Sequence, residues 1–273
     1  MEKLLIFNQK GGVGKSTSVV KIAGCLSQKK KKVLVIDIDA QCTATSYLRT
    51  IEGDCENTLF DYIIEEAAKE DVIYNISFKK WSHRAHGYIP QATNISLVPS
   101  DKRFNAEVFR KEWNDYDFFK RFFTPDLEEQ FDYCIFDCPG YISSLTESAL
   151  RVCDYIIVPA FADMDSLVGY SDLIDTKNRI RAETDNTGLE LLGVVFTSVQ
   201  GSVNRQIIAY CKEQMGVETI FKSTIRRKTV ALDARIVGKP ISYYKPKDTL
   251  SLDYIDLTNE FLDKIKAAKK GKK

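Results

Sequence analysis

The 273-residue sequence lacks the features that mark several large classes of protein. No apolar run approaches the roughly 18 residues that a membrane-spanning helix needs. The chain starts Met-Glu-Lys and runs directly into a strand-like segment, so no signal peptide is visible. Its 39 basic and 38 acidic side chains nearly cancel, so any nucleic-acid binding must come from a local patch. We therefore expect a cytoplasmic protein.

Patterns typical of metal sites and disulfide frameworks are also missing. The seven cysteines are odd in number, scattered, and mostly in apolar segments, which predicts reduced thiols. Cys134 and Cys138 lie within and just after an apolar segment, and no second Cys/His pair follows at a spacing typical of zinc sites. The two histidines, His83 and His86, lie in a polar stretch over residues 81–93, which we interpret as a solvated loop.

What the sequence does contain is an alternation of short apolar runs and helical patterns. The expected strands cover residues 4–7, 33–37, 95–98, 133–137, 155–158 and 191–196. The expected helices cover residues 16–29, 59–69 and 104–123, and a last one is marked by Leu252, Ile255, Leu262 and Ile265. Continuous apolar strands separated by helices predict an α/β fold with a doubly wound, mainly parallel sheet that binds ligands at its carboxyl edge.

No stretch rich in proline, glycine or serine divides the chain, and no internal repeat is present. We therefore expect a single domain over residues 1–273. Residues 266–273 read KAAKKGKK, which predicts a basic and flexible tail.

A glycine-rich segment, FNQKGGVGKST over residues 7–17, follows the first expected strand and opens the first expected helix. It nearly fits the phosphate-loop pattern G-x-x-x-x-G-K-[ST], but Gln9 replaces the first glycine and Lys10 adds a second lysine. Glycines let backbone N–H groups curl around an anion, and the positive end of the new helix points at the same place. Lys15 is expected to reach the β and γ phosphates, and Ser16 to place its hydroxyl on Mg²⁺. The alternative, a glycine-rich turn without a ligand, fits less well, because GKST lies at a strand-to-helix junction.

Acidic side chains end two of the expected strands. Asp137 closes the strand YCIFD, and Asp37 and Asp39 follow VLVI, where alternation places both on the same side. Such carboxylates can orient Mg²⁺-bound waters and position an attacking water, or they can simply cap a helix. Their expected place at the carboxyl edge of a nucleotide-type sheet favours the functional interpretation.

At this point the motifs resemble a known family. NQKGGVGKST, VLVIDIDAQ and FDYCIFDCPG are similar to segments of the deviant Walker A ATPases, specifically the ParA-type partition ATPases. The resemblance continues through LTESALRVCDYIIVPAFADMDSLVGYSDL, GVVFTSV and GKPISYYKPKDTLSLDYIDLTNEF. It covers most of the chain and is weakest over residues 52–94. It implies a P-loop NTPase fold with ATP and Mg²⁺ as cofactors.

The resemblance also implies what the second lysine does. In this family two subunits sandwich two ATP molecules, and the lysine corresponding to Lys10 reaches the partner's phosphates. A charge that arrives only on dimerisation couples nucleotide binding to assembly and stabilises developing phosphate charge. The implied catalytic residues are Lys10, Lys15 and Asp39, with Asp39 positioning water. The implied nucleotide-binding residues are Lys10, Gly11, Gly12, Val13, Gly14, Lys15, Ser16 and Thr17, with Thr17 on the α-phosphate. The implied metal-binding residues are Ser16, Asp37 and Asp137.

Several positions depart from the family pattern. DIDAQ replaces the usual DxDPQ, and Cys42 stands where glycine is common, which predicts a differently shaped loop after Asp39. DCPG replaces DCPP, so Gly140 is expected to loosen the segment after Asp137. Near the adenine, Arg226-Arg227-Lys228 replaces Pro-Arg-Asn. The chain starts at the first strand, so operator binding through the N-terminal helix-turn-helix of longer members is not expected.

Residues 222–247, called the basic segment below, contain eight Lys or Arg side chains and one acid, Asp233. Such a run is either a solvated face or a surface for a phosphate backbone, and the resemblance favours DNA. Binding of this kind is expected to be sequence-tolerant and salt-sensitive. The expected DNA-binding residues are Arg226, Arg227, Lys228, Arg235, Lys239, Lys245 and Lys247.

The resulting hypothesis is an ATPase that dimerises on ATP and binds non-specific DNA. Its slow hydrolysis is stimulated by a ParB-type or other cargo-binding partner, and its ATP state is nucleoid-associated. The alternative is a MinD-like membrane-positioning ATPase, which needs bulky apolar residues in a C-terminal amphipathic helix. Only alanines follow Ile265 as apolar residues, so only electrostatic adhesion to anionic lipid stays open. An iron–sulfur carrier would need a CxxC pair and a tyrosine autokinase a terminal tyrosine cluster, and the sequence has neither.

Overall fold

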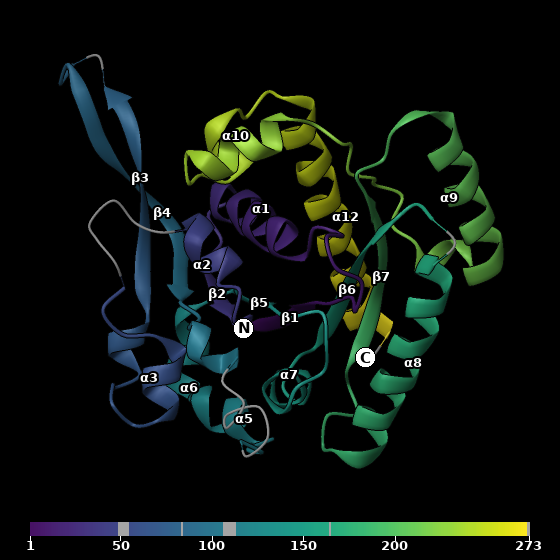
Figure 1. Cartoon of the computed structure of the whole chain (residues 1–273), viewed down its shortest axis with the longest axis horizontal. Coiled ribbons are helices and arrows are strands. Elements are labelled where there is room, and N and C mark those ends of the chain that lie inside the picture. The colour runs from purple at the N-terminus through teal and green to yellow at the C-terminus, as the bar shows by residue number, and fades with distance from the viewer. Residues whose placement is uncertain (49–54, 83, 106–112, 164, 272–273) are drawn as a thin grey trace.

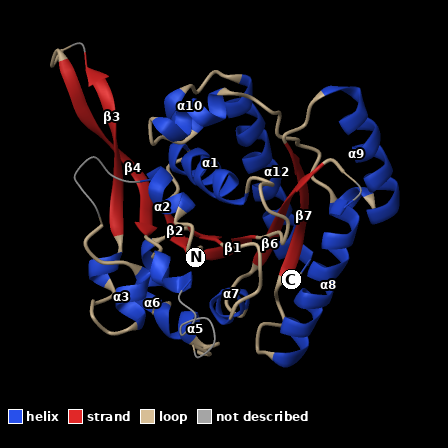
Figure 2. Ribbon diagram, in the orientation of Figure 1, coloured by secondary structure: helices blue, strands red, loops and turns tan. Residues whose placement is uncertain are grey.

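The computed structural model describes residues 1–48, 55–82, 84–105, 113–163 and 165–271. These residues form one seven-stranded sheet with helices on both faces (Figures 1 and 2). The strand order is β3-β4-β2-β5-β1-β6-β7, and all neighbouring strands are parallel except β3 and β4. The strands are β1 (Glu2–Ile6), β2 (Val33–Asp37), β3 (Tyr74–Ser82), β4 (Gly87–Val98), β5 (Tyr133–Asp137), β6 (Tyr155–Phe161) and β7 (Glu190–Thr197).

Helices of very different length connect these strands. The long ones are α1 (Lys15–Gln28), α8 (Asp165–Glu183), α9 (Gly201–Met215) and α12 (Thr249–Gly271). The short ones are α2 (Thr43–Leu48), α3 (Leu59–Ile63), α5 (Phe118–Phe122), α6 (Pro125–Gln130), α7 (Ser144–Leu150), α10 (Val230–Ile236) and α11 (Ile241–Tyr244). Single 3₁₀ turns are η1 (Glu70–Val72), η2 (Lys102–Asn105) and η3 (Val217–Thr219). No described helix combines the length and the apolar character needed to cross a membrane.

Two hydrophobic cores lie on opposite faces of the sheet, because its central strands are apolar on both sides. Leu34 and Ile36 of β2 join the core beneath α3 and α5 to α9. Val33 and Val35 join the other core, which α1, α2 and α10 to α12 cover. This arrangement confirms the predicted doubly wound, mainly parallel P-loop fold.

Strand order places the predicted acidic residues together. β5 lies between β1 and β2, and the register pairs Asp137 with Ile6 on one side and with Asp37 on the other. The loop after β1 therefore begins beside Asp137, at the edge where parallel α/β sheets bind ligands.

The prediction of a polar loop over residues 81–93 is wrong. Most of this stretch belongs to an antiparallel hairpin of β3 and β4, which is paired as far as Ser82 and Gly87. Residue 83 lies outside the described residues, and His86 is exposed in the turn. Among the β3 residues whose burial is described, Ile76 and Phe78 are the ones buried in the core. The outer part therefore lacks the apolar alternation that identifies a strand in a sequence, and backbone pairing defines it instead.

Two expected helices are shorter in the structure. The helix expected over residues 59–69 ends at Ile63, and that expected over 104–123 is helical at Phe118–Phe122, while residues 106–112 lie outside the described part. Phe118, Phe119 and Phe122 belong to a packed aromatic cluster, so their spacing reflects burial of one short helix. Residues 266–271, expected as a tail, continue α12, where Lys269 forms an ion pair with Glu2.

Candidate functional site

The loop between β1 and α1 has the backbone conformation that a phosphate cradle requires. Gly12 and Gly14 have φ values of 76° and 89°, in the left-handed region that favours glycine. Gly14 immediately precedes α1, so the positive end of this helix faces the loop. No atom lies within 4 Å of the position that a Cβ would take at Gly11, Gly12 or Gly14. An anion can therefore approach the loop backbone closely.

Buried polar side chains fix this loop to the neighbouring strands. The Asn8 amide donates from Nδ2 to the carbonyl of Pro159 at 2.8 Å, while Oδ1 accepts the Lys10 N–H at 2.8 Å. Thr197 donates from Oγ1 to the Val13 carbonyl at 2.7 Å. Sequence reasoning missed both anchors, although each is a polar residue at the end of an apolar strand. Their hydrogen bonds hold the loop open before any ligand binds.

Lys15, Ser16 and Thr17 form the first turn of α1, as a phosphate loop requires. Lys15 donates from Nζ to the Lys10 carbonyl at 3.2 Å, so its amine lies along the loop. Burial lowers the pKa of Lys15, and the negative charges of Asp137 and Asp39 oppose that shift. The amine thus lies in a partly buried site, where a bound phosphate would favour its protonated, charged form.

Asp137 is fully buried, and no described residue donates a hydrogen bond of good geometry to its carboxylate oxygens, although the Ser16 hydroxyl lies near enough to interact. Burial raises its pKa well above the usual range, and the charges of Asp37 and Asp39 add to that rise. The Ser16 hydroxyl and the Lys15 charge lie close enough to lower the pKa of Asp137 and so oppose part of this rise. A buried carboxylate without a partner costs free energy, so this group favours a cation beside it.

Asp37 and Asp39 differ from Asp137 in their partners. Asp37 is buried and accepts hydrogen bonds from the N–H and the Oγ1 of Thr45, each at 2.8 Å, and from the Asp39 N–H at 3.0 Å. Asp37 therefore stabilises the start of α2, which is the helix-capping role considered above. Burial raises its pKa. Asp39 is half-buried and accepts the Gln41 N–H at 2.9 Å.

Two departures from the family pattern have clear places in the structure. Cys42 has a φ of 50°, the left-handed conformation for which glycine is favoured. A Cβ at Gly140 would lie 2.9 Å from the Gln9 carbonyl oxygen and 3.4 Å from Lys15 Nζ. The segment after Asp137 therefore packs directly against the phosphate loop, and this close approach is what requires glycine at position 140.

The second lysine of the loop is ion-paired within the chain. Lys10 Nζ lies 2.6 Å from Oδ2 of Asp163, which follows β6, and 6.0 Å from the centre of the Phe161 ring. The two charged side chains are 34% and 36% exposed. Sequence reasoning missed Asp163, although it follows a buried strand as Asp37 and Asp137 do.

Within the described residues, no three His, Cys, Asp or Glu side chains gather closely enough to hold a metal ion alone. Magnesium does not need such a cluster, because it keeps several waters and uses one or two carboxylates together with substrate phosphates. The unpartnered Asp137 carboxylate beside Ser16 and the loop fits such an ion.

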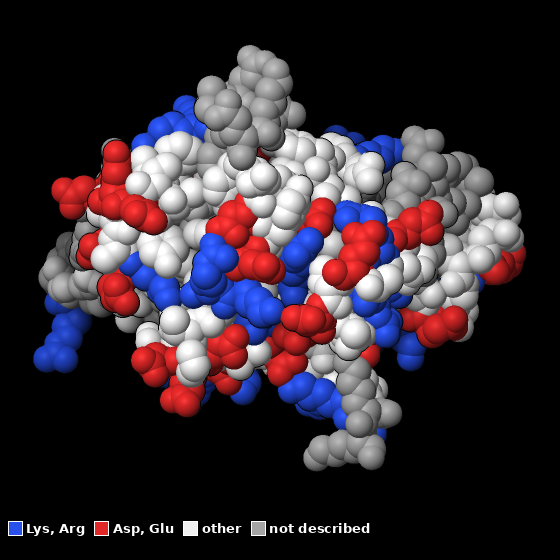
Figure 3. Space-filling view, turned by 90° about the horizontal axis from the view of Figure 1, so that it is seen from below, with Lys and Arg blue, Asp and Glu red and all other residues white. Residues whose placement is uncertain are grey.

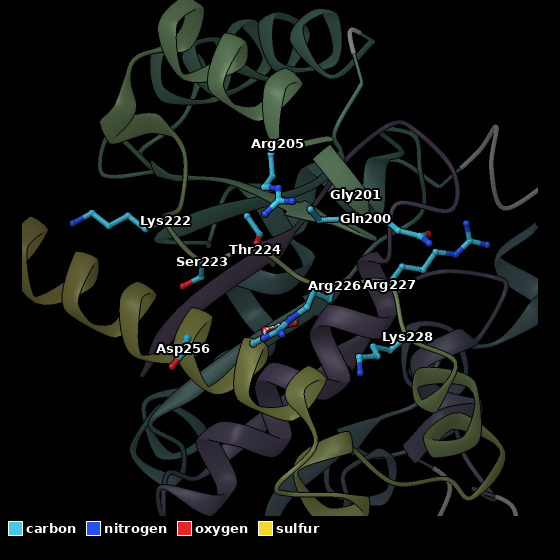
Figure 4. A pocket seen from close by; sticks show the side chains of 12 residues that line it. Gln200, Gly201, Arg205, Lys222, Ser223, Thr224, Arg226, Arg227, Lys228 and Asp256 are labelled. Carbon is cyan, nitrogen blue, oxygen red and sulfur yellow. Dashed lines mark hydrogen bonds and ion pairs between the residues drawn. The ribbon is translucent and has the colours of Figure 1, made fainter. Parts of the chain in front are cut away.

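A cavity of about 720 Å³ lies beside the basic segment (Figure 4). Arg226 lies across α12, and its Nε is 3.0 Å from both oxygens of Asp253, whose side chain is only 6% exposed. Arg227 and Lys228 extend away from α12 (Figure 4) and are exposed. Of the residues expected to bind DNA, Arg226 is therefore one that already has a structural partner, Asp253.

The remaining members of that set lie at the surface. Lys239 is half-buried, and its amine contacts the Lys79 carbonyl of β3. The fully exposed members are Arg235, Lys245 and Lys247.

A mainly parallel sheet with a glycine cradle, a lysine in the first turn of the following helix and a buried carboxylate on the adjacent strand defines a P-loop nucleotide-binding protein. A family model described as "AAA domain" matches residues 1–191, and the chain belongs to this family. More particularly, it is a ParA/MinD-type P-loop ATPase.

Relatives support this assignment, and a solved structure has the same fold. The chain is 30% identical over 259 residues to the sporulation initiation inhibitor protein Soj of Bacillus subtilis, covering 94% of this chain and 96% of Soj. It is 25% identical over 266 residues to the chromosome partitioning protein ParA of Caulobacter vibrioides, covering 96% and 94%. The ATP complex of Cyanothece McdA has the same fold, with a TM-score of 0.77, 24% identity and 96% of each chain covered.

Proposed function

We propose that this chain is an ATP-dependent dimerising partition ATPase that binds non-specific DNA and positions a DNA molecule or other cargo. One observation carries the proposal: the loop contains a second lysine, Lys10, that is one-third exposed and held by an ion pair at the site's rim. A single phosphate loop does not need this lysine. A second subunit would give it a function.

The chemistry follows from the placement of the other groups. ATP phosphates would lie on the N–H groups of residues 11–17, with Lys15 on the β and γ phosphates and Thr17 on the α-phosphate. Ser16, Asp137 and Asp37 would hold Mg²⁺, which neutralises phosphate charge when it is bound. Asp39, which is half-buried and beside Asp37, would orient the attacking water.

The Lys10–Asp163 pair makes dimerisation and hydrolysis conditional. A partly exposed ion pair contributes about 1 kcal/mol or less, so it can be replaced by contact with a partner's phosphates. While Lys10 stays on Asp163, it stabilises no phosphate charge in either subunit, and hydrolysis is slow. ATP bound between two subunits would move Lys10 to its catalytic position.

The dimer would present two copies of the basic segment to DNA. Arg227, Lys228, Arg235, Lys245 and Lys247 are exposed, and they would contact phosphates without reading the bases. Lys239 and Arg226 would contribute less, because the first is half-buried and the second pairs with Asp253. A ParB-type or other cargo-bound partner would stimulate hydrolysis, and the protein would then dissociate from the nucleoid DNA.

A membrane-positioning role is the second candidate, because α10 exposes apolar side chains beside a cation. Leu232 is 61% exposed and Ile236 77% exposed, on either side of Arg235. However, α10 has only seven residues, which is short for a membrane-surface helix.

Binding to a random-sequence DNA duplex and to anionic vesicles, with ATP, ADP or no nucleotide, tests the proposal. Wild type should bind the duplex only with ATP, and Lys10→Ala should lose at least about tenfold of that affinity along with the ATP-dependent dimer. Lys29→Ala, an exposed change after α1, is the control and should behave as wild type. ATP-dependent vesicle binding without duplex binding would overturn the proposal and favour the membrane role.

A further inference from the structure

The β3–β4 hairpin extends beyond the sheet to which it belongs. β4 pairs with β2 only through Ile95 to Val98, whereas its pairing with β3 continues outward to Gly87. Figure 1 shows this outer half, below called the arm (residues 77–92), projecting from the sheet edge on the same side as α10. Nothing in the nucleotide site requires such a projection.

The arm has an unusual charge pattern. Residues 72–100 contain no acid, the second-longest acid-free run after residues 3–36, which include the phosphate loop. Lys79, Lys80 and Arg84 are exposed within it. By contrast, the face of the molecule seen in Figure 3 intermixes basic and acidic side chains. The arm therefore has a one-signed charge, which favours a polyanionic partner.

The base of the hairpin is fixed beside the basic segment. The Phe78 ring packs edge-on against the Tyr243 ring of α11, with centroids 5.1 Å apart. Ser27 of α1 joins both elements: its Oγ is hydrogen-bonded to the Tyr243 hydroxyl at 2.8 Å and accepts the Asn94 N–H at 2.9 Å. The Lys239 amine contacts the backbone carbonyl of Lys79, so the basic segment touches the backbone of the arm.

We propose that the arm binds the phosphate backbone of duplex DNA through Lys79, Lys80 and Arg84, as an extension of the basic segment. This inference rests on the DNA binding proposed above and assigns it a second, separate contact surface. Phosphates would supply the negative charge that residues 72–100, which contain no acid, do not supply themselves.

The geometry favours a groove over a flat surface. Consecutive residues of a strand point to opposite faces, so Lys79 and Lys80 lie on opposite faces of the ribbon. A two-stranded ribbon fits the major groove, where phosphates line both sides. The exposed apolar residues Tyr88 and Ile89 also alternate, so they lie on opposite faces of the ribbon.

The test compares two variants that remove the same charge. One is the arm variant Lys79→Ala/Lys80→Ala/Arg84→Ala, and the other is the control Lys102→Ala/Lys120→Ala/Arg181→Ala, which changes exposed cations outside both surfaces. Duplex affinity is measured with ATP over a series of salt concentrations. The slope of log affinity against log salt should become less steep by about three for the arm variant, since each lost phosphate contact changes it by roughly 0.9. The control should keep the wild-type slope, and basal ATP hydrolysis should stay unchanged in both.

Each outcome separates the arm from the function on which it rests. If wild type binds the duplex and the arm variant has the same salt slope as the control variant, the inference about the arm is overturned and the proposed function stays intact. No wild-type binding of the duplex with ATP overturns both. Loss of binding to phosphatidylglycerol vesicles in the arm variant, with duplex binding unchanged, also overturns the inference and makes the arm a membrane contact.

Discussion

The carboxyl edge of the sheet and helix α12 both bury carboxylates, but they satisfy them differently. On α12, Asp253 pairs with Arg226, and Glu260 accepts the N–H groups of Lys222 and Ser223 at 2.7 and 2.8 Å. At the sheet edge, Asp137 accepts no hydrogen bond of good geometry from the residues that the structure describes. The carboxylates of α12 are satisfied within the chain, and the sheet edge leaves a buried carboxylate for a ligand to satisfy. The nucleotide-free protein is therefore less stable than it could be because of the sheet edge, which is where the chemistry is expected.

Replacing Asp137 should give the largest effect of the proposed changes, because it removes the buried carboxylate at the sheet edge. Asp137→Asn should lower ATP hydrolysis by at least about 100-fold, because the cation would lose a ligand. It should also stabilise the nucleotide-free protein by on the order of 2 kcal/mol, because an unpartnered buried charge is removed. Urea unfolding and steady-state hydrolysis measure the two effects.

The pH dependence of this effect has a definite sign. Because the folded-state pKa of Asp137 is raised, its contribution to stability should fall as the pH rises above about 4, the ordinary carboxyl range. Asp137→Asn should remove part of that fall, whereas the exposed control Asp126→Asn should not. A variant that is both less active and less stable than wild type would contradict the interpretation.

Lys21 is a buried cation that packs against α12. It is 1% exposed, its amine lies 5.2 Å from the centre of the Tyr254 ring, and burial lowers its pKa to about 8. Lys21→Met should raise stability at pH 7 by up to about 3 kcal/mol, because it removes the cost of a buried ammonium.

For wild type, the unfolded chain holds the Lys21 proton more tightly than the folded one. Stability should therefore rise with pH between about 8 and the ordinary lysine value of about 10.4, and the gain from Lys21→Met should shrink over the same range. Thermal melts at several pH values measure this. A gain that is independent of pH would exclude the charge as its cause, and Lys29→Met at an exposed site is the control.

Replacing Asp253 tests the region of α12, where the carboxylate has a partner, and we expect a smaller effect there. Asp253→Ala should destabilise the fold by about 2 kcal/mol, because the Arg226 guanidinium and N–H lose their acceptor. The Arg226 side chain is half-exposed, which keeps the loss below that of a fully buried pair. Asp256→Ala, exposed on the same helix, should stay within about 0.5 kcal/mol of wild type. Equal effects of the two changes in urea unfolding would refute the structural role of the pair.

Local sequence was sufficient where one strong signal determined one element. The apolar runs ending at Asp37 and Asp137 predicted β2 and β5 with the observed bounds, because strands buried on both faces are continuously apolar. The phosphate loop was predictable because Gly12 and Gly14 take left-handed backbone angles that favour glycine, and because Lys15 follows them at the start of α1. The hairpin was missed, because exposed strands show no apolar alternation.

By itself the sequence determined the fold class and the chemical parts of the site, because burial and glycine geometry act over a few neighbouring residues. Only the tertiary structure decided which parts meet. It placed Asp137 without a partner between β1 and β2, gave Asp37 to Thr45, and paired Lys10 with Asp163 from 153 positions away. These outcomes depend on strand order and on contacts between distant segments, and neither is encoded in the local pattern of residues.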